Sequence, residues 1–293
     1  MSDYVDYIIV NKKPLHIPNA RVRFYGGEEA LQEWGYPRLG HRVDKIGLHN
    51  ILGDWPEMLV EEPRDTQTDE RIAEMFDEQD RSGTHFIIDG DGSIVQVADP
   101  ATRLCYHIHA KAWNRTSIGI EWAKYADGGI TVPSLEAGNQ LCQALCISFW
   151  FPMTIADYDG RWNFEVSVDD PHFAGLGPHS LVTDQRGVGD CGRIIPKYLV
   201  DHGPFELLDV RVGSDGESEY TRVYKARQME LGVHPDGWPG VDFRNAALAA
   251  GYRQGMYQLG KERETPAYPL PDFLSAVGPV RYAMCELLCP HDH

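Results

Sequence analysis

Residues 84–122 read THFIIDGDGSIVQVADPATRLCYHIHAKAWNRTSIGIEW, and this stretch decides the fold. Its first part predicts a β-hairpin, because the apolar segments 86–88 and 94–97 flank the turn sequence Asp-Gly-Asp-Gly. The apolar segment 117–122 predicts a further, buried strand. A polar loop rich in histidine, lysine, tryptophan and asparagine joins the hairpin to that strand.

The predicted strand 117–122 carries one carboxylate, Glu121, directly after the apolar run Ile118-Gly119-Ile120. A glutamate is rarely buried without a partner or a chemical task, because desolvating its charge costs free energy. Glu121 is therefore a candidate functional residue.

A second polar residue ends an apolar strand upstream. Residues 43–50, VDKIGLHN, alternate between apolar and polar positions and end in His49. An open α/β sheet presents its working side chains at such strand ends. Residues 65–80 predict an amphipathic helix, and residues 133–150 predict a core helix with one broad apolar face. Alternation of strands and helices indicates the α/β class.

Three motifs occur in a fixed order: the hairpin HFIID-DG, the loop HA…N and the strand SIGIE. In this order the sequence resembles the zinc amidases that cut the bond between N-acetylmuramic acid and L-alanine in peptidoglycan, a family that includes the peptidoglycan recognition proteins. The resemblance covers roughly residues 44–196. It implies an α/β fold with a central mixed β-sheet flanked by helices, Zn²⁺ as cofactor, and peptidoglycan or a muropeptide as substrate.

The resemblance also implies a set of zinc ligands. His49 takes the place of the first family ligand, His179 matches the second, and Asp190 matches the third. Thiolate and carboxylate are both good zinc donors, so Cys191 is an alternative third ligand. His172 is a weaker competitor for His179.

The family resemblance gives Glu121 the role of general acid and base. Many relatives carry a lysine where this chain has Val188, and Arg186 is the nearest cation that can replace it. His109, rather than the nearby His107, aligns with a family histidine beside the pocket.

Two further residues of the same loop, Trp113 and Asn114, are expected to shape the pocket or contact the glycan and peptide, as is His109. The alternative for these two is structural: Asn114 caps a turn and Trp113 packs on the core.

Composition limits the choice of partners. The formal net charge of −17 argues against nucleic acid, which requires clusters of Lys and Arg, and against electrostatic attachment to an anionic membrane or wall polymer. The N-terminal sequence lacks the basic start and apolar core of a secretory signal, so we expect a cytoplasmic location unless another route releases the protein. The oligomeric state stays open.

The cysteines show two patterns. Cys142 and Cys146 lie four residues apart on a predicted helix and are expected to be small buried apolar residues. The cluster Cys285, Cys289, His291 and His293 has metal-binding chemistry, although such a cluster at the end of a chain is more often incidental.

Two domains are expected: residues 1–212, the amidase domain with an N-terminal extension at 1–43, and residues 213–293, a small helical domain. The polar segment GSDGESE at 213–219 has the composition of a linker. The spacings Q--LG and DG--G that follow resemble a small peptidoglycan-binding module. Two rival functions remain: a recognition protein without activity, and a zinc amidase that cuts another peptidoglycan amide.

Overall fold

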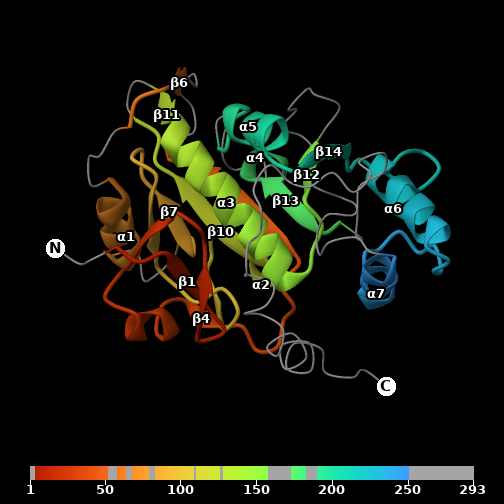
Figure 1. Ribbon diagram of the computed structural model, residues 1–293, viewed down its shortest axis with the longest axis horizontal. Coiled ribbons are helices and arrows are strands. Elements are labelled where there is room, and N and C mark those ends of the chain that lie inside the picture. The colour runs from red at the N-terminus through yellow and green to blue at the C-terminus, as the bar shows by residue number, and fades with distance from the viewer. Residues whose placement is uncertain are drawn as a thin grey trace.

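The computed structural model describes residues 4–51, 58–63, 68–78, 83–108, 110–125, 128–157, 173–182 and 190–250. Its centre is a mixed eight-stranded sheet with the order β14-β12-β13-β5-β10-β7-β8-β3 (Figure 1). Neighbouring strands are parallel except for the antiparallel pair β7 and β8. In sheet order the strands are Glu206–Asp209, Thr154–Asp157, Gly175–Pro178, Lys45–Asn50, Ser117–Trp122, Phe86–Ile88, Ser93–Gln96 and Arg21–Phe24.

The predicted hairpin is the antiparallel pair. Strands β7 and β8 pair Ile88 with Ile94, and the backbone N–H of Asp89 donates to the carbonyl of Ser93 at 2.9 Å. Gly92 adopts φ +80°, a conformation that glycine reaches without a steric penalty. The turn sequence therefore fixes the register of the hairpin.

Helices cover the sheet on both sides, as the sequence predicts. The core helix α3 runs across one face (Figure 1), where its apolar side packs on Ile46, Ile118 and Ile120. The amphipathic helix α1 packs on Ile87 and Val95 at the opposite face. The helices are α1 Thr68–Glu78, α2 Lys111–Thr116, α3 Val132–Phe149, α4 His179–Val182, α5 Ile194–His202, α6 Glu219–Glu230 and α7 Val241–Ala249, with a short 3-10 helix at Glu29–Gln32.

The N-terminal extension contributes to the main sheet. Its strand β3 forms one edge, and two small pairs lie beside it: β1 (Tyr7–Val10) with β2 (Lys13–His16), and β4 (Tyr36–Pro37) with β9 (Arg103–Leu104). The side-chain amide of Gln96 accepts from the N–H of Ile9 at 2.8 Å and donates to its carbonyl at 2.7 Å. The third small pair joins β6 (Met58–Val60) to β11 (Gly129–Thr131).

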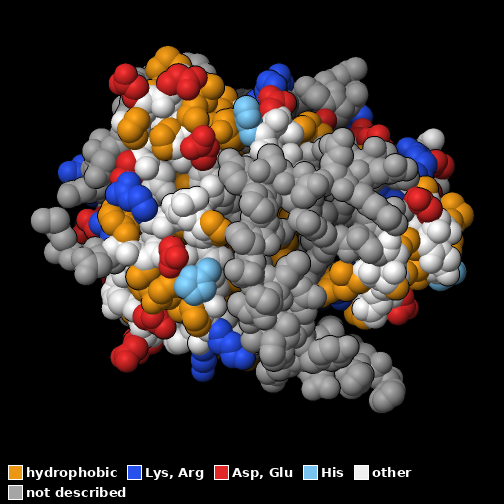
Figure 2. Space-filling view, viewed as in Figure 1, with side chains coloured by type: hydrophobic (Ala, Val, Ile, Leu, Met, Phe, Trp, Pro, Cys, Tyr) orange, Lys and Arg blue, Asp and Glu red, His pale blue; other side chains and the backbone are white. Residues whose placement is uncertain are grey.

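Cys142 and Cys146 are fully buried thiols in the core beneath α3, as predicted. The cysteines and histidines at 285–293 lie outside the described residues. Among the residues that the structure describes, none of the helices has the length and apolar character needed to cross a membrane. On the face shown in Figure 2, acidic and basic side chains are scattered among apolar ones.

Helix α6 lies beside strand β14 at one end of the sheet (Figure 1). Tyr220, Tyr224 and Phe243 share an apolar cluster with Ala156 and Leu208 of the sheet. The described residues 213–250 therefore share a core with the rest of the chain. The domain boundary at 212/213 stays a prediction.

The motif residues of this C-terminal part have a structural role. The side-chain amide of Gln228 donates to Asp236 Oδ1 and to the carbonyl of Trp238, and it accepts from the N–H of Gly237 at 2.7 Å. The amide thereby ties helix α6 to the Asp-Gly turn before α7. Binding of peptidoglycan by this C-terminal part stays a prediction.

A buried ion pair joins α6 to the edge of the sheet. Arg227, which is 1% exposed, donates to both carboxylate oxygens of Glu206 in β14, at 2.8 and 2.9 Å. Its guanidinium carbon also lies 4.7 Å from the ring centroid of Tyr224. A planar guanidinium matches this bidentate geometry, which a lysine cannot reproduce.

Replacing Arg227 with leucine leaves the Glu206 carboxylate without its partner. We expect Arg227→Leu to lower the free energy of unfolding by about 3 kcal/mol, measured by chemical denaturation. The exposed pair Lys197–Asp201 is the matched control, and Lys197→Ala should cost less than about 1 kcal/mol. Equal losses for the two variants would contradict this account of the α6 contact.

Candidate metal centre

Pairing of neighbouring parallel strands places the candidate residues. His49 lies in β5 directly opposite Glu121 in β10, so both side chains project from the same face of the sheet. Strand β13 pairs with the other side of β5 and ends at Pro178, and His179 follows immediately. Asp190 lies just before helix α5. Three separate segments thus converge at one end of β5.

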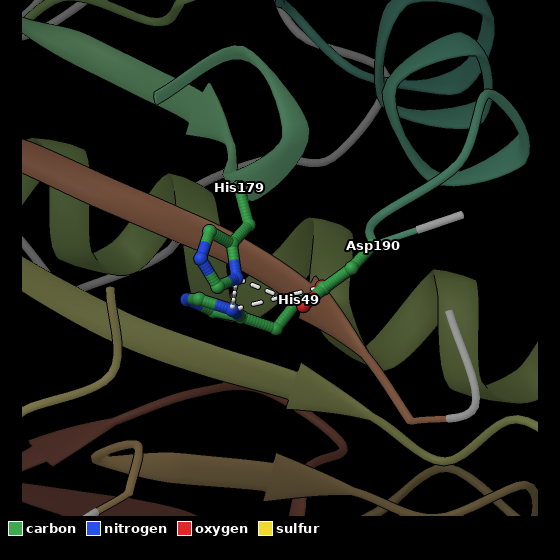
Figure 3. A group of neighbouring side chains, drawn as sticks. All are labelled: His49, His179 and Asp190. Carbon is green, nitrogen blue, oxygen red and sulfur yellow. Dashed lines mark hydrogen bonds and ion pairs between the residues drawn. The ribbon is translucent and has the colours of Figure 1, made fainter. Parts of the chain in front are cut away.

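The two imidazoles and the Asp190 carboxylate form a tight, buried group (Figure 3). His49 Nδ1 lies 3.0 Å from His179 Nδ1, and His179 Nδ1 lies 2.8 Å from Asp190 Oδ2. His49 Nδ1 is 3.7 Å from Asp190 Oδ1. Each residue therefore offers one donor atom to a common point.

These distances fit a tetrahedral zinc ion. Zinc bonds to nitrogen and oxygen of ~2.0–2.2 Å place two ligand atoms of a tetrahedron roughly 3.3–3.6 Å apart. The two imidazole nitrogens lie 3.0 Å apart, and the Asp190 carboxylate lies 2.8 Å from His179 through Oδ2 and 3.7 Å from His49 through Oδ1, so the separations lie on either side of that range. Two neutral imidazoles and one carboxylate are also a donor set that zinc accepts, with a fourth position left for water or substrate.

Asp190 is held in its ionised form. Burial raises the pKa of its carboxyl, but the hydrogen bond with His179 and the electrostatic effect of the two neighbouring histidines outweigh burial and hold the pKa well below its ordinary value. The backbone N–H of Asn50 donates to Asp190 Oδ1 at 3.0 Å, and the N–H of Ser180 donates to the Asp190 carbonyl at 2.6 Å. The end of β5 therefore orients the carboxylate, and Ser180 in α4 fixes the backbone of Asp190.

Cys191, the alternative third ligand, is placed differently. Its side chain is fully buried in the apolar core cluster that contains Ile195 and Leu199 of α5. The group of converging donor atoms contains Asp190 and not the Cys191 thiol. The geometry favours Asp190. His109, His172 and Arg186 lie outside the described residues, so their expected roles stay predictions.

A third histidine, His107, contacts the cluster. Its Nδ1 lies 2.8 Å from His49 Nε2, and its Nε2 lies 2.8 Å from the hydroxyl of Ser117. Burial lowers the pKa of His107 well below its ordinary value, and the neighbouring histidines lower it further. The family resemblance indicates His109, not His107, as the histidine beside the pocket.

Glycines make room for this histidine. Gly47 and Gly119 lie opposite each other in β5 and β10, and a Cβ on either would lie 2.6 Å from an atom of the His107 ring. Gly177 of β13 is the next residue in this row, and a Cβ there would lie 2.3 Å from the Trp113 ring. In the sequence, the glycines of the segments IGL at 46–48 and IGI at 118–120 are the feature that indicates a ring packed on the sheet.

Trp113 and Asn114 have internal roles in the described structure. Trp113 is 8% exposed and stacks on Phe173, with ring centroids 6.1 Å apart. The side-chain oxygen of Asn114 accepts from the N–H groups of His107 and Ile108 at 3.1 and 3.0 Å. These contacts match the structural alternative of a capped loop and a core tryptophan. Contact of either residue with substrate stays a prediction.

Residues 39–159 match the sequence profile of the family described as N-acetylmuramoyl-L-alanine amidase. The resemblance to these amidases is thereby confirmed. The match covers less than half of the 293 residues and includes His49 and Glu121. We call residues 39–159 the amidase segment. No curated protein matched the chain.

Several solved structures are similar to this chain at low identity. An endolysin N-acetylmuramoyl-L-alanine amidase from Clostridium intestinale has 16% identity and a TM-score of 0.40, covering 64% of this chain and 97% of its own. The hydrolase AmiA of Staphylococcus aureus has 17% identity and a TM-score of 0.37, covering 56% and 67%. The Drosophila peptidoglycan recognition protein SA has 12% identity and a TM-score of 0.39, covering 64% and 94%.

A buried Arg–His contact joins Arg38 to His85 of the amidase segment. The N–H of Gly119 donates to His85 Nδ1 at 3.0 Å, so the Nε2–H of His85 donates to the carbonyl of Arg103 at 3.2 Å. The guanidinium of Arg38 lies 3.3 Å from the same Nε2. Burial, and then the charge of Arg38, lower the pKa of His85 from 6.5 to about 3. Burial also lowers the pKa of Arg38 to about 10.

This depressed pKa predicts a loss of stability in acid. The unfolded chain binds the His85 proton near pH 6.5, whereas the folded protein binds it only near pH 3. The unfolded state therefore holds more protons between these values, and the free energy of unfolding falls as the pH drops from 6.5 toward 3. One such histidine contributes a slope of up to about 1.4 kcal/mol per pH unit.

The measurement is denaturant unfolding at several pH values for the parent chain and for His85→Asn, whose side-chain oxygen can still accept from Gly119. We expect a smaller slope for His85→Asn. The exposed His202 serves as the control, and His202→Asn should keep the slope of the parent chain. An unchanged slope in His85→Asn would show that His85 is not the group responsible.

Proposed function

We propose that this protein is a zinc-dependent amidase that hydrolyses the amide bond between N-acetylmuramic acid and L-alanine in peptidoglycan or muropeptides. One observation carries the proposal: the buried group of His49, His179 and Asp190 adjoins Glu121, and His49 and Glu121 belong to the amidase segment. A binding protein has no need for a buried carboxylate beside a set of metal-binding side chains.

His49, His179 and Asp190 would hold the zinc ion. When bound, the ion supplies Lewis-acid activation of the amide carbonyl and lowers the pKa of water. The protein's part is to keep the three donor atoms convergent, which it does by taking them from β5, from the first residue of α4 after β13, and from the segment before α5. Two neutral ligands and one anionic ligand leave the loaded site with a net positive charge.

Glu121 is placed for proton transfer. Its position directly opposite His49 on a parallel strand puts the two residues about 5 Å apart between backbones, so a carboxylate can reach a water beside the cluster. Glu121 takes a proton from the attacking water and delivers it to the L-alanine nitrogen as the amide C–N bond breaks. The carboxylate is 7% exposed, and this low exposure shields the transferred proton from bulk water.

The test combines zinc content with product analysis. We expect the parent protein to bind about one zinc per chain and to release L-alanine-headed peptides from purified muropeptides, identified by mass spectrometry. Glu121→Gln should retain zinc and lose activity by about 10²–10⁴-fold, because general acid–base catalysis contributes that much. Glu136→Gln, on the exposed side of α3, is the matched control and should keep full activity.

Contrary outcomes would support one of the rival functions or a different mechanism. A zinc-free protein that binds muropeptides without cutting them would show a recognition protein. Products that carry a cleaved peptide bond and an intact lactyl amide would show an amidase with another target. Full activity in Glu121→Gln would remove Glu121 from the mechanism.

A further inference from the structure

We propose that His107 and Ser117 are positioning residues that fix the His49 ring in one tautomer, with the Nδ1 lone pair directed at the metal cluster. The inference rests on the proposed function only in naming zinc as the ion that this lone pair binds. It follows from a chain of hydrogen bonds that begins at a backbone carbonyl, where the direction of donation is not in doubt.

The chain begins at Trp113 in helix α2. Its backbone carbonyl can only accept, so the hydroxyl of Ser117, 2.6 Å away, must donate its single proton there. The same hydroxyl lies 2.8 Å from His107 Nε2. With its proton already used, the hydroxyl oxygen accepts, and His107 Nε2 must carry a hydrogen.

The His107 ring then determines the direction of the next hydrogen bond, to His49. A neutral imidazole carries one N–H, so Nδ1 of His107 is an acceptor. His49 Nε2 lies 2.8 Å from that atom and must donate to it. His49 Nδ1 is therefore the unprotonated nitrogen, and it is the atom that lies 3.0 Å from His179 Nδ1 in the cluster.

The fold holds the His107 ring in this place. Gly47 and Gly119 leave space on the sheet for the His107 ring. A Cβ at either position would lie 2.6 Å from a ring atom, so any other residue would fill that space. Asn114 accepts from the His107 backbone N–H at 3.1 Å and so fixes the base of the side chain. The ring meets His49 edge-on, with an interplanar angle of 86°.

The other tautomer of His49, with its proton on Nδ1, shows why the ring must be held in the Nε2–H form. If His49 carried its proton on Nδ1, that N–H would point at the Asp190 carboxylate, whose Oδ1 lies 3.7 Å away. At 3.7 Å this contact is an electrostatic attraction rather than a hydrogen bond, but a proton on Nδ1 would still remove the lone pair that a metal needs. The hydrogen bonds from Trp113 through Ser117 and His107 disfavour the Nδ1–H tautomer of His49, because they give its Nε2–H an acceptor.

The test reads the tautomer in the metal-free, full-length protein. Long-range proton–nitrogen NMR spectra of ¹⁵N-histidine-labelled protein at about pH 8, where a histidine of ordinary pKa is neutral, distinguish protonated from unprotonated ring nitrogens. His49→Gln assigns the signals. We expect Nε2–H for His49 in the parent, and a growing share of Nδ1–H in Ser117→Ala and His107→Leu.

Zinc affinity, measured by competition with a chromophoric chelator, is the second readout. We expect a loss on the order of 10-fold for Ser117→Ala and up to about 100-fold for His107→Leu. His107→Asn keeps an acceptor near the position of Nδ1 and should recover part of the affinity. Ser180→Ala, which removes a buried hydroxyl beside His179, is the matched control and should leave the His49 tautomer unchanged.

Two results would overturn the proposal: His49 protonated at Nδ1 in the parent, or Ser117→Ala and His107→Leu with the same tautomer and affinity as Ser180→Ala. Neither readout depends on amidase activity. If the protein binds zinc but cuts no muropeptide, the proposed function fails while the tautomer result stands. If the tautomer result fails in an active enzyme, only the positioning role is lost.

Discussion

The parallel pairing of β5 with β10 is the constraint on which the site depends. Its register sets Glu121 opposite His49 and Gly119 opposite Gly47. A shift of one residue would turn Glu121 toward the apolar face beneath α3, where Ile118, Ile120 and Trp122 now pack, and would bury an unpaired carboxylate. The stability of the core and the geometry of the candidate site therefore depend on one and the same register.

The two faces of β5 and β10 differ in composition and in function. One face carries large apolar side chains and contacts α3, which supplies the main hydrophobic contribution to stability. The other carries glycines and buried polar residues, and the absence of a side chain at the glycines admits the rings of His107 and Trp113. Packing on the first face permits the second to be specialised, because the sheet does not need apolar contacts on both sides near the cluster.

Much of the fold could be predicted from local patterns. The hairpin, the strand that ends at His49, the buried strand with Glu121 and the core helix α3 all follow from periodicity and turn residues within one short segment each. The family resemblance then supplied the three residues of the cluster, although they are separated by up to 141 positions along the chain, from His49 to Asp190.

The remaining features depend on contacts between distant segments. The role of His107 requires its ring to meet His49, and only the tertiary packing brings these rings together. The Arg227–Glu206 pair likewise requires α6 to lie beside β14, which no local sequence pattern indicates. A sequence motif gives residue types and spacing, but it does not give the direction of a buried side chain.

The most direct test of the metal centre is X-ray absorption spectroscopy of the zinc-loaded, full-length protein. The account predicts a first shell of nitrogen and oxygen atoms at ~2.0–2.2 Å, with the outer-shell scattering of two imidazole rings and without sulfur. A sulfur atom at ~2.3 Å that persists when Cys285 and Cys289 are replaced with serine would show that a cysteine such as Cys191 is a ligand and would contradict the assignment of Asp190. A shell without imidazole scattering would contradict the metal centre itself.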